Sequence, residues 1–329
     1  MSKVLFVIDT LDTGGAERSI LELTRQFKNI KASVCILFES KNDLKAEFTN
    51  RNIPVYELQL SKHDKFWLFK GLRKVRSVLA NVQPQIVHAH LYRSELLMRL
   101  AKPSHSILVG AFVNDSYSKE RYDALSLMGK LKLYAYQLTD RTTAGRSNYF
   151  TSVSNTITAS NCKKLGIPLS KVITIYRGRT VTIFQSDKSL QVPHQKGYRF
   201  LTVGRLLKRK GYIELIDAAR MLKEKQQNFH LQIAGDGADA DFIHSYAAAL
   251  VQDGTIEFLG TRIDVPQLLR DCDCFIMASH YEGQGGALVE AMLSSKPIIA
   301  SDIPVFREQV VHTISARLFE LKNAKALCT

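Results

Sequence analysis

Short apolar segments alternate with longer amphipathic ones along the whole chain, and this alternation constrains the fold more than any other feature. The apolar runs are rich in β-branched residues and lie at 4–8, 33–38, 85–90, 107–113, 149–154, 199–204, 230–235, 255–260, 274–279 and 297–301. Strands separated by helices pair in parallel, because each right-handed crossover returns the chain to the same end of the sheet. We therefore predict an α/β fold built on parallel sheets.

Length and a polar segment predict two domains. The 329 residues are about twice the length of a typical domain. Residues 180–198 are polar, lack helical periodicity and contain proline and glycine, which is typical of a linker. We place the boundary near residue 190, so that the domains are 1–190 and 191–329. Two such units would form a cleft between the carboxyl ends of their strands, where open parallel sheets bind ligands.

The net charge of +14 is confined to the first domain. Residues 1–190 contain 29 Lys and Arg against 15 Asp and Glu, whereas residues 191–329 contain 16 of each. A basic excess in one domain indicates an anionic partner for that domain, such as lipid phosphates or nucleic acid. No nucleic-acid-binding motif accompanies the charge, so we predict no nucleic-acid partner.

Cysteine usage and hydropathy predict a cytoplasmic protein. The five cysteines are scattered, odd in number and without paired metal-ligand spacing. No stretch of 18 apolar residues occurs, and the first apolar run is too short for a signal-peptide core. Any membrane contact is therefore expected to be peripheral.

A basic stretch at 62–78 combines Phe66, Trp67 and Phe69 with five Lys and Arg residues. As a helix it could rest on an anionic membrane face. We favour the alternative, in which it is a crossover helix whose apolar stripe packs on the core. Gly71 weakens the helix prediction.

The segment 280–292 is the most informative for function. A buried strand ends before it, a glycine-rich turn follows, and a helix then begins. Glycines let backbone amides approach a phosphate, and a helix N-terminus adds unpaired N–H groups. The glycines of the turn are Gly283, Gly285 and Gly286. This arrangement predicts an anion site that fits a diphosphate.

Two carboxylates bracket the turn. Seven residues separate Glu282 from Glu290, which lies about one turn into the helix on the side facing the loop. A carboxylate accepts two hydroxyl hydrogen bonds, so each is suited to the vicinal diol of a ribose or hexose. The alternative, a helix-capping Glu282 and a solvated Glu290, is not decided by this loop alone.

A basic loop follows the strand that ends at Gly204. If this loop and the glycine turn lie at the carboxyl ends of strands in one sheet, Arg205 and Lys210 could reach the same phosphates. The alternative is a solvated basic turn.

Two histidines end the strand at 85–90. His88 and His90 alternate, so their side chains share one face of the strand. A neutral imidazole there could bind substrate hydroxyls, and His90, at the strand end, is the better candidate. Metal binding would need a third ligand, which the sequence does not indicate. Asp271 and Asp273 are interpreted as residues of a turn and a strand start, so no metal site is predicted.

With these segments in place the chain resembles the family 4 retaining glycosyltransferases of GT-B fold, through nearly its whole length and in the family order. The matching motifs are TGGAE (13–17), VHAH (87–90), VSNT (153–156), KVITIYRG (171–178), VGRL (203–206), KRKG (208–211), IAGDG (233–237), FLG (258–260) and EGQGGALVEAM (282–292). The resemblance implies two Rossmann-like parallel-sheet domains that face each other across a cleft.

The resemblance also implies roles for residues. Glu290 would bind the ribose of a nucleotide-sugar donor, and Glu282 would contact the transferred sugar. Arg205 and Lys210 would serve the diphosphate, and His90 would lie near the reacting sugar. The other implied donor-binding residues are Gly14, Gly15, Gly235, Arg262, Gly283, Gln284, Gly285 and Gly286.

The implied activity is hexosyl transfer with retention of configuration from a UDP- or GDP-linked sugar, without a metal ion or other cofactor. Family members are usually drawn as reacting by front-face attack, and paired cations with aligned amides would stabilise the departing diphosphate. The N-terminal domain would hold the acceptor. Its basic charge favours a lipid-linked or otherwise anionic glycan acceptor in lipopolysaccharide, capsule or exopolysaccharide assembly, at the inner face of the cytoplasmic membrane.

Some positions depart from the family pattern. Gln284 stands where an aromatic or aliphatic residue is frequent, and Arg177 and Thr180 replace the asparagine and aspartate of an NG-x-D turn. Only 39 residues follow Glu290, so the last helices of the family are expected to be missing. The alternative functions are a catalytically silent nucleotide-sugar or carbohydrate-binding protein, and a sugar-nucleotide epimerase or phosphorylase of the same architecture.

Overall fold

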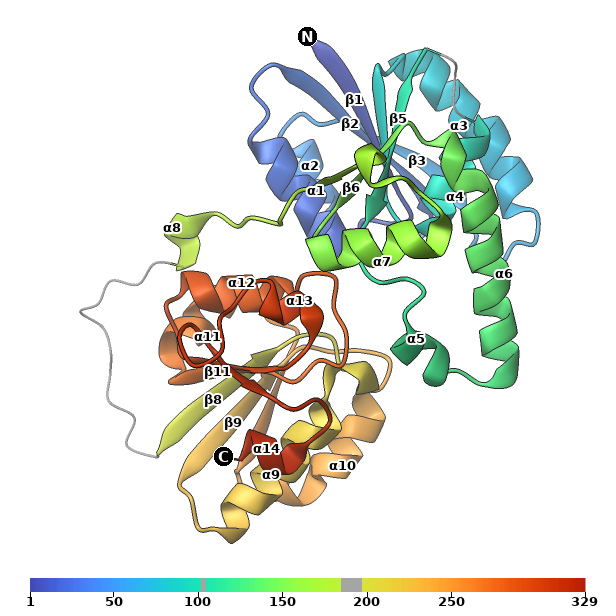
Figure 1. Cartoon of the computed structure of the whole chain (residues 1–329). Coiled ribbons are helices and arrows are strands. Elements are labelled where there is room, and N and C mark those ends of the chain that lie inside the picture. The colour runs from blue at the N-terminus through green and yellow to red at the C-terminus, as the bar shows by residue number, and fades with distance from the viewer. Residues whose placement is uncertain (102–104, 185–196, 329) are drawn as a thin grey trace. The chain divides into compact units, whose positions relative to one another are not determined.

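A computed structural model of the chain describes residues 1–101, 105–184 and 197–328 (Figure 1). The chain divides into two compact units, Met1–Gly178 and Arg179–Thr329. The predicted boundary near residue 190 lies outside the described residues. Each unit is an α/β domain around one parallel sheet, which confirms the predicted fold class.

The first unit contains a seven-stranded sheet in the order β3-β2-β1-β4-β5-β6-β7, with every pairing parallel. The strands are β1 (Ser2–Ile8), β2 (Ile30–Phe38), β3 (Val55–Leu60), β4 (Ile86–Ala89), β5 (Ile107–Phe112), β6 (Tyr149–Ser152) and β7 (Val172–Thr174). All five predicted strands are present. The two that sequence analysis missed, β3 and β7, are the edge strands, which have one paired side and a weaker apolar pattern.

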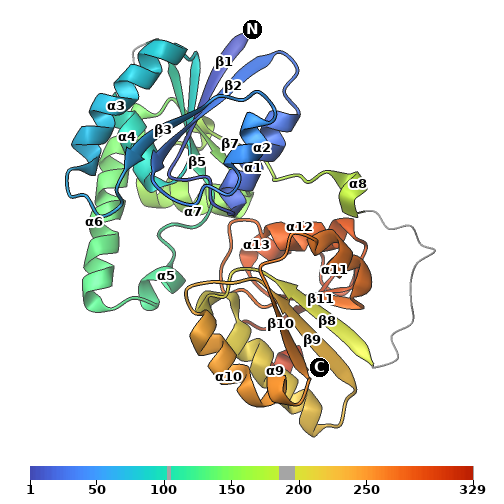
Figure 2. The ribbon, with the colours of Figure 1, turned by 180° about the vertical axis from the view of Figure 1, so that it is seen from behind.

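Helices cover both faces of this sheet (Figures 1 and 2). They are α1 (Gly15–Arg25), α2 (Lys45–Thr49), α3 (Trp67–Val82), α4 (Tyr92–Ala101), α5 (Lys119–Asp123), α6 (Leu127–Thr143) and α7 (Asn155–Leu165). Alternate side chains of β1 enter two cores: Phe6 packs with residues of α1 and α2, whereas Leu5 packs with residues of α3 and α4. A central strand buried on both faces explains its continuous apolar sequence.

The basic stretch at 62–78 contributes to α3, and the helix continues through Gly71. A Cβ atom at Gly71 would lie 3.1 Å from Leu97 and 3.2 Å from Leu60, so glycine allows α3 to approach α4 and β3 closely. Val75 is buried and Trp67 packs against the core, which confirms the core-packing interpretation. Phe66 and Phe69 remain exposed.

The second unit contains a six-stranded parallel sheet in the order β10-β9-β8-β11-β12-β13. The strands are β8 (Tyr198–Val203), β9 (Phe229–Ala234), β10 (Ile256–Gly260), β11 (Cys274–Met277), β12 (Ile298–Ser301) and β13 (Arg317–Phe319). The helices are α8 (Val181–Phe184), α9 (Tyr212–Glu224), α10 (Ala240–Gln252), α11 (Val265–Asp271), α12 (Gly286–Leu293), α13 (Pro304–Arg307) and α14 (Ala324–Leu327). The five predicted strands are confirmed, and the three-residue edge strand β13 was missed.

Among the helices of the described ranges, none has the length and apolar character needed to cross a bilayer.

Candidate functional site

The strand order of the second unit reverses between β8 and β11, which are direct neighbours. Ligands of open parallel sheets bind outside the carboxyl ends of the strands at such a reversal. The loops that leave β8 and β11 meet there, and the His280 N–H donates to the Arg209 carbonyl at 2.8 Å. The basic loop and the glycine turn therefore lie at the carboxyl ends of neighbouring strands in one sheet, which was the condition for a shared phosphate site.

Gly211 positions the basic loop. Its φ of +74° is in the left-handed region, and a Cβ atom there would lie 2.0 Å from the Ala278 carbonyl oxygen. Only glycine permits this close crossing of the end of β11. The crossing places Lys210 in an ion pair with Glu282, with 14% and 11% of the two side chains exposed.

Glu282 is an ionised, largely buried carboxylate. The Ser279 hydroxyl donates to its Oε1 at 2.9 Å, in addition to the Lys210 ammonium. Burial raises the pKa of Glu282, but Lys210, Arg209 and Ser279 together outweigh this effect and lower the pKa below its usual value. Because Glu282 contacts these groups, the helix-capping interpretation is wrong.

The glycine turn leads directly into α12. Gly285 is the N-cap residue, has a φ of +82°, and provides no side-chain cap. Adjacent to it, Gln284 is buried, and its carbonyl accepts a hydrogen bond from the Gln309 side chain. The first turn of α12 therefore presents backbone N–H groups that no N-cap side chain occupies, which suits an anionic group.

Glu290 is held by Arg179, a residue that sequence analysis did not select. The Arg179 Nε donates to Glu290 Oε1 at 2.8 Å, and the side chains are 10% and 13% exposed. A Cβ atom at Gly286 would lie 2.7 Å from Arg179 Nη2, so the guanidinium also lies against the glycine turn. The interpretation of Glu290 as a solvated residue is wrong. The sequence signal for Arg179 was its place within the altered NG-x-D turn, between Arg177 and Thr180.

The other predicted donor-binding residues of this unit differ in their surroundings. Arg205 is exposed, and no side chain or carbonyl within the described ranges pairs with its guanidinium. Arg262 instead forms a bidentate pair with Asp264, with Nε to Oδ1 at 2.7 Å. Gly235 has a backbone role, since a Cβ atom there would lie 1.9 Å from the Gly204 carbonyl oxygen.

The first unit has an equivalent reversal between β1 and β4. Gly14 and Gly15 follow β1 at the start of α1, and His90 follows β4. A Cβ atom at Gly15 would lie 3.1 Å from Arg177 Nη1, so this altered turn residue lies against the glycine pair. The predicted glycine pair and histidine are thus at one sheet reversal, with Arg177 as an added cation.

His90 is buried and neutral. Neither of its ring nitrogens has a hydrogen-bond partner in the part of the chain that the structure describes. Burial lowers its pKa well below the usual value, and the nearby His88 and Arg177 lower it further. The His88 ring lies 4.2 Å away, and its Nε2 is 3.0 Å from the Thr151 hydroxyl, which supports a structural role for His88. His90 is therefore a buried polar side chain that the described residues leave without a hydrogen bond, which is rare in folded proteins.

The acidic residues near β11 have structural roles. Asp271 accepts a hydrogen bond from the Gln267 amide at 2.8 Å, and Asp273 accepts one from the Arg199 N–H at 2.7 Å. Asp273 directly precedes β11, as predicted, whereas Asp271 is the last residue of α11 and does not lie in a turn. Within the described residues, no group of three His, Cys, Asp or Glu side chains is arranged to hold a metal ion.

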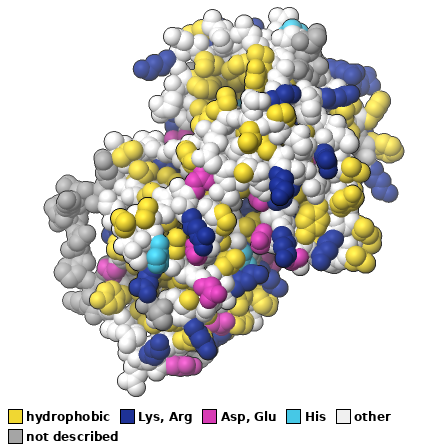
Figure 3. All heavy atoms as spheres, in the orientation of Figure 1, with side chains coloured by type: hydrophobic (Ala, Val, Ile, Leu, Met, Phe, Trp, Pro, Cys, Tyr) yellow, Lys and Arg dark blue, Asp and Glu magenta, His cyan; other side chains and the backbone are white. Residues whose placement is uncertain are grey.

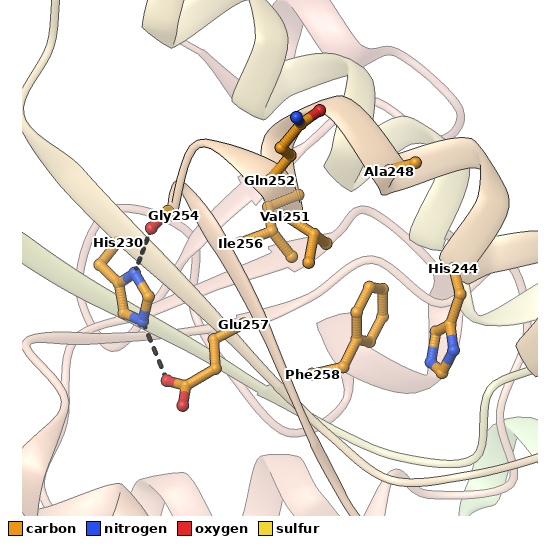
Figure 4. Close-up of a pocket in the computed structure, with 9 residues that line it drawn as sticks. All are labelled: His230, His244, Ala248, Val251, Gln252, Gly254, Ile256, Glu257 and Phe258. Carbon is orange, nitrogen blue, oxygen red and sulfur yellow. Dashed lines mark hydrogen bonds and ion pairs between the residues drawn. The ribbon is translucent and has the colours of Figure 1, made fainter.

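A pocket at the edge of the second sheet is separate from these residues (Figure 4). It lies between α10 and β10, and none of the predicted site residues lines it. His230 is satisfied by the Gly254 carbonyl and Glu257, each at 3.0 Å, and the His244 ring lies 4.2 Å from that of Phe258. Because none of the predicted site residues lines this pocket, we do not assign the function to it.

The fold and its two sheet reversals define a GT-B type protein. The structure of HepE from Anabaena, solved in complex with UDP and glucose, superposes with a TM-score of 0.82 at 20% identity, covering 100% of this chain and 88% of that one. A family model described as Glycosyltransferase Family 4 matches residues 13–183, and one described as Glycosyl transferases group 1 matches residues 184–328. The chain belongs to glycosyltransferase family 4.

Two relatives illustrate its position in the family. The N,N'-diacetylbacillosaminyl-diphospho-undecaprenol alpha-1,3-N-acetylgalactosaminyltransferase of Campylobacter jejuni is 31% identical over 170 residues, which cover 50% of this chain and 42% of that protein. The capsular polysaccharide biosynthesis glycosyltransferase CapH of Staphylococcus aureus is 23% identical over 313 residues, covering 92% and 82%. The name of the first relative describes transfer of N-acetylgalactosamine to a sugar linked to diphospho-undecaprenol, and that of the second places it in capsular polysaccharide biosynthesis.

Proposed function

We propose that the protein transfers a hexosyl group, with retention of configuration, from a nucleotide-diphosphate-sugar to a lipid-linked or polysaccharide acceptor in surface glycan assembly. The observation that carries this proposal is the grouping of Lys210, Glu282 and the N-terminus of α12 at one sheet reversal. A cation, a carboxylate and backbone N–H groups in one place match the diphosphate and hydroxyl groups of such a donor.

In this proposal, different residues bind different parts of the donor. Arg205, Lys210 and the N–H groups of the turn would hold the diphosphate and stabilise the negative charge that grows on it as it leaves. These fixed positive groups supply the electrostatic stabilisation, so the proposed reaction uses no metal ion or other cofactor. Glu290 would accept the ribose hydroxyls, and Glu282 would accept hydroxyls of the transferred sugar.

The acceptor is assigned to the basic first unit. Its neutral His90 would contact a sugar hydroxyl at the reacting centre, while its cations favour an anionic acceptor. The undecaprenol-diphosphate acceptor in the name of the C. jejuni relative supports a lipid-linked substrate. On this basis we place the reaction at the cytoplasmic face of the cytoplasmic membrane.

The test is donor binding followed by turnover. Among UDP-, GDP- and ADP-sugars we expect a UDP- or GDP-sugar to raise the melting temperature of the protein, because a ligand of the native state stabilises it. The same donor should then release nucleotide only when a lipid-linked glycan acceptor is added. Protection without any turnover would favour a silent binding protein, and absence of protection by every donor would reject the assignment of the site.

A further inference from the structure

The outer face of α6 is apolar and exposed. The helix has large side chains that are between 51% and 74% exposed, namely Leu127, Met128, Leu131, Tyr134 and Leu138. Four of them follow a spacing of four, three and four residues, which aligns them in one stripe along a helix. Single exposed apolar residues are normal on a protein surface, whereas these residues form one continuous stripe.

Polar contacts hold the opposite face of α6 in place. Asp140 is buried, forms an ion pair with Arg99 of α4, and accepts a hydrogen bond from the Tyr117 hydroxyl at 2.8 Å. Arg99 also pairs with the buried Glu95. Leu133 adds one buried apolar side chain on this inner face. These inner contacts hold α6 on its unit. The apolar side chains of the outer stripe are therefore not needed to attach the helix.

Cations surround the stripe. Lys130, Lys132 and Arg141 lie on α6, and the helix contains a single acidic residue, the buried Asp140. Figure 3 shows hydrophobic side chains interleaved with Lys and Arg in the region where Figure 1 places α6. An apolar stripe with basic flanks and no exposed carboxylate is the pattern of a helix that lies in the interface of an anionic bilayer.

We propose that α6 is the surface through which the protein binds an anionic lipid bilayer, with Leu131, Tyr134 and Leu138 inserted and the flanking cations against the headgroups. The charge pattern decides between occupants: a second copy of this chain would bring the same cations toward each other, whereas a bilayer rich in acidic lipid neutralises them. The proposal rests on the proposed function in one respect, since a membrane-bound acceptor gives the contact its purpose.

The exposed aromatic residues at the start of α3 are a second candidate for a membrane-binding surface. Phe66 and Phe69 are 70% and 73% exposed beside Lys65 and Lys70, but the remaining apolar face of α3 is packed in the core. Two aromatic residues at one helix end bury less apolar surface than the stripe of α6. Substitution of this pair therefore controls for a general loss of surface hydrophobicity.

The experiment is co-sedimentation of the full chain with vesicles of phosphatidylglycerol and phosphatidylcholine (1:2), and with pure phosphatidylcholine. We expect binding to the anionic vesicles only, weakened at 0.5 M salt. The triple variant Leu131→Ser, Tyr134→Ser, Leu138→Ser should reduce the partition coefficient at least tenfold, and Lys130→Glu with Lys132→Glu should do the same. The control Phe66→Ser, Phe69→Ser should bind within twofold of the wild type.

Three results would overturn the proposal: wild-type binding by the triple variant, loss of binding in the Phe66 and Phe69 control alone, or a wild-type dimer in sedimentation equilibrium that the triple variant dissociates. Donor protection against thermal unfolding, measured on the same samples, shows that each variant is folded. It also separates the two proposals, because vesicle binding without donor protection would reject the proposed function and leave the role of α6 standing.

Discussion

At the scale of single residues, Arg179 changes how the proposed donor site is understood. Its Nε occupies one oxygen of Glu290, the carboxylate proposed for the ribose, and its guanidinium lies beside Gly286 in the turn proposed for the diphosphate. A ribose that binds Glu290 must share or replace this contact. A displaced guanidinium would already be next to the phosphates, where a bidentate cation is strongly bound. Arg179 is therefore expected to join Arg205 and Lys210 as a diphosphate ligand.

Arg179→Ala should weaken donor binding about 10- to 150-fold, because a hydrogen bond to a charged group contributes about 1.5–3 kcal/mol. Arg179→Lys should recover part of this loss, since it restores the charge without the bidentate geometry. Isothermal titration with the donor identified by thermal protection gives the dissociation constants. Arg307→Ala, which removes a surface pair with Asp302, is the control and should bind normally. Tighter donor binding by Arg179→Ala would mean that Arg179 blocks the site.

The Lys210–Glu282 pair makes a prediction about stability and pH. Lys210→Met leaves a largely buried carboxylate without its cation and should lower the free energy of unfolding by about 3 kcal/mol at pH 7. The folded pKa of Glu282 is lowered, so the stabilisation is complete above the usual value of 4.5 and is lost as the pH falls through the folded value. The difference in the free energy of unfolding between Lys210→Met and the wild type should therefore become smaller below pH 4.5.

Urea unfolding between pH 3 and pH 7 measures this difference. Lys223→Met is the matched control, because its pair with Asp253 is far more exposed, and it should cost less than about 1 kcal/mol. A pH-independent effect of Lys210→Met would show that the pair does not control the protonation of Glu282.

At the scale of elements, the site depends on how loops leave neighbouring strands. Lys210 and Glu282 are 72 residues apart in sequence and meet because β8 and β11 are adjacent. Gly211 is the residue that allows the crossing, since its φ is +74° and a Cβ atom would clash with the Ala278 carbonyl oxygen. A side chain at this position must move the basic loop away from Glu282.

Backbone strain alone at a position with positive φ costs about 1–3 kcal/mol. Gly211→Ala should lower the free energy of unfolding by more than this, because it adds a steric clash. It should also abolish most donor binding. Gly254→Ala is a matched control: its φ is +79°, but a Cβ atom there has open space. Gly254→Ala should lower the free energy of unfolding by the cost of backbone strain and should bind the donor with wild-type affinity. Thermal unfolding with and without donor measures both quantities, and equal behaviour of the two variants would contradict the role given to Gly211.

Sequence patterns predicted every strand with neighbours on both sides and the edge strand β10, and missed the edge strands β3, β7 and β13. The strands β3, β7 and β13 have one paired side, and β7 and β13 are three residues long, so their apolar signal is short or alternating. The loops of the site were predicted because parallel strands place their carboxyl ends together. The Arg179 contact with Glu290 was not, because it depends on the path of the chain after β7, and no periodic pattern encodes that path.

At the scale of the whole molecule, the charge is divided between the units, and this division has a kinetic consequence. The basic excess lies within residues 1–190, the part of the chain to which we assign the acceptor, whereas residues 191–329 are balanced. Long-range attraction between such a unit and an anionic acceptor is screened by salt, since the Debye length falls from about 10 Å at 0.1 M to about 3 Å at 1 M. An uncharged acceptor would not experience this attraction.

We therefore expect kcat/KM for a diphosphate-linked acceptor to fall about tenfold or more between 50 mM and 500 mM salt, because electrostatic steering contributes about 10- to 1000-fold to association rates at low ionic strength. The same glycan on an uncharged soluble carrier should react more slowly at low salt and show little further decline. Both acceptors use the same donor, so salt effects on donor binding cancel in the ratio of their rates. A ratio that is independent of salt, or equal activity on the neutral acceptor, would mean that the positive charge of the first unit does not serve acceptor recognition.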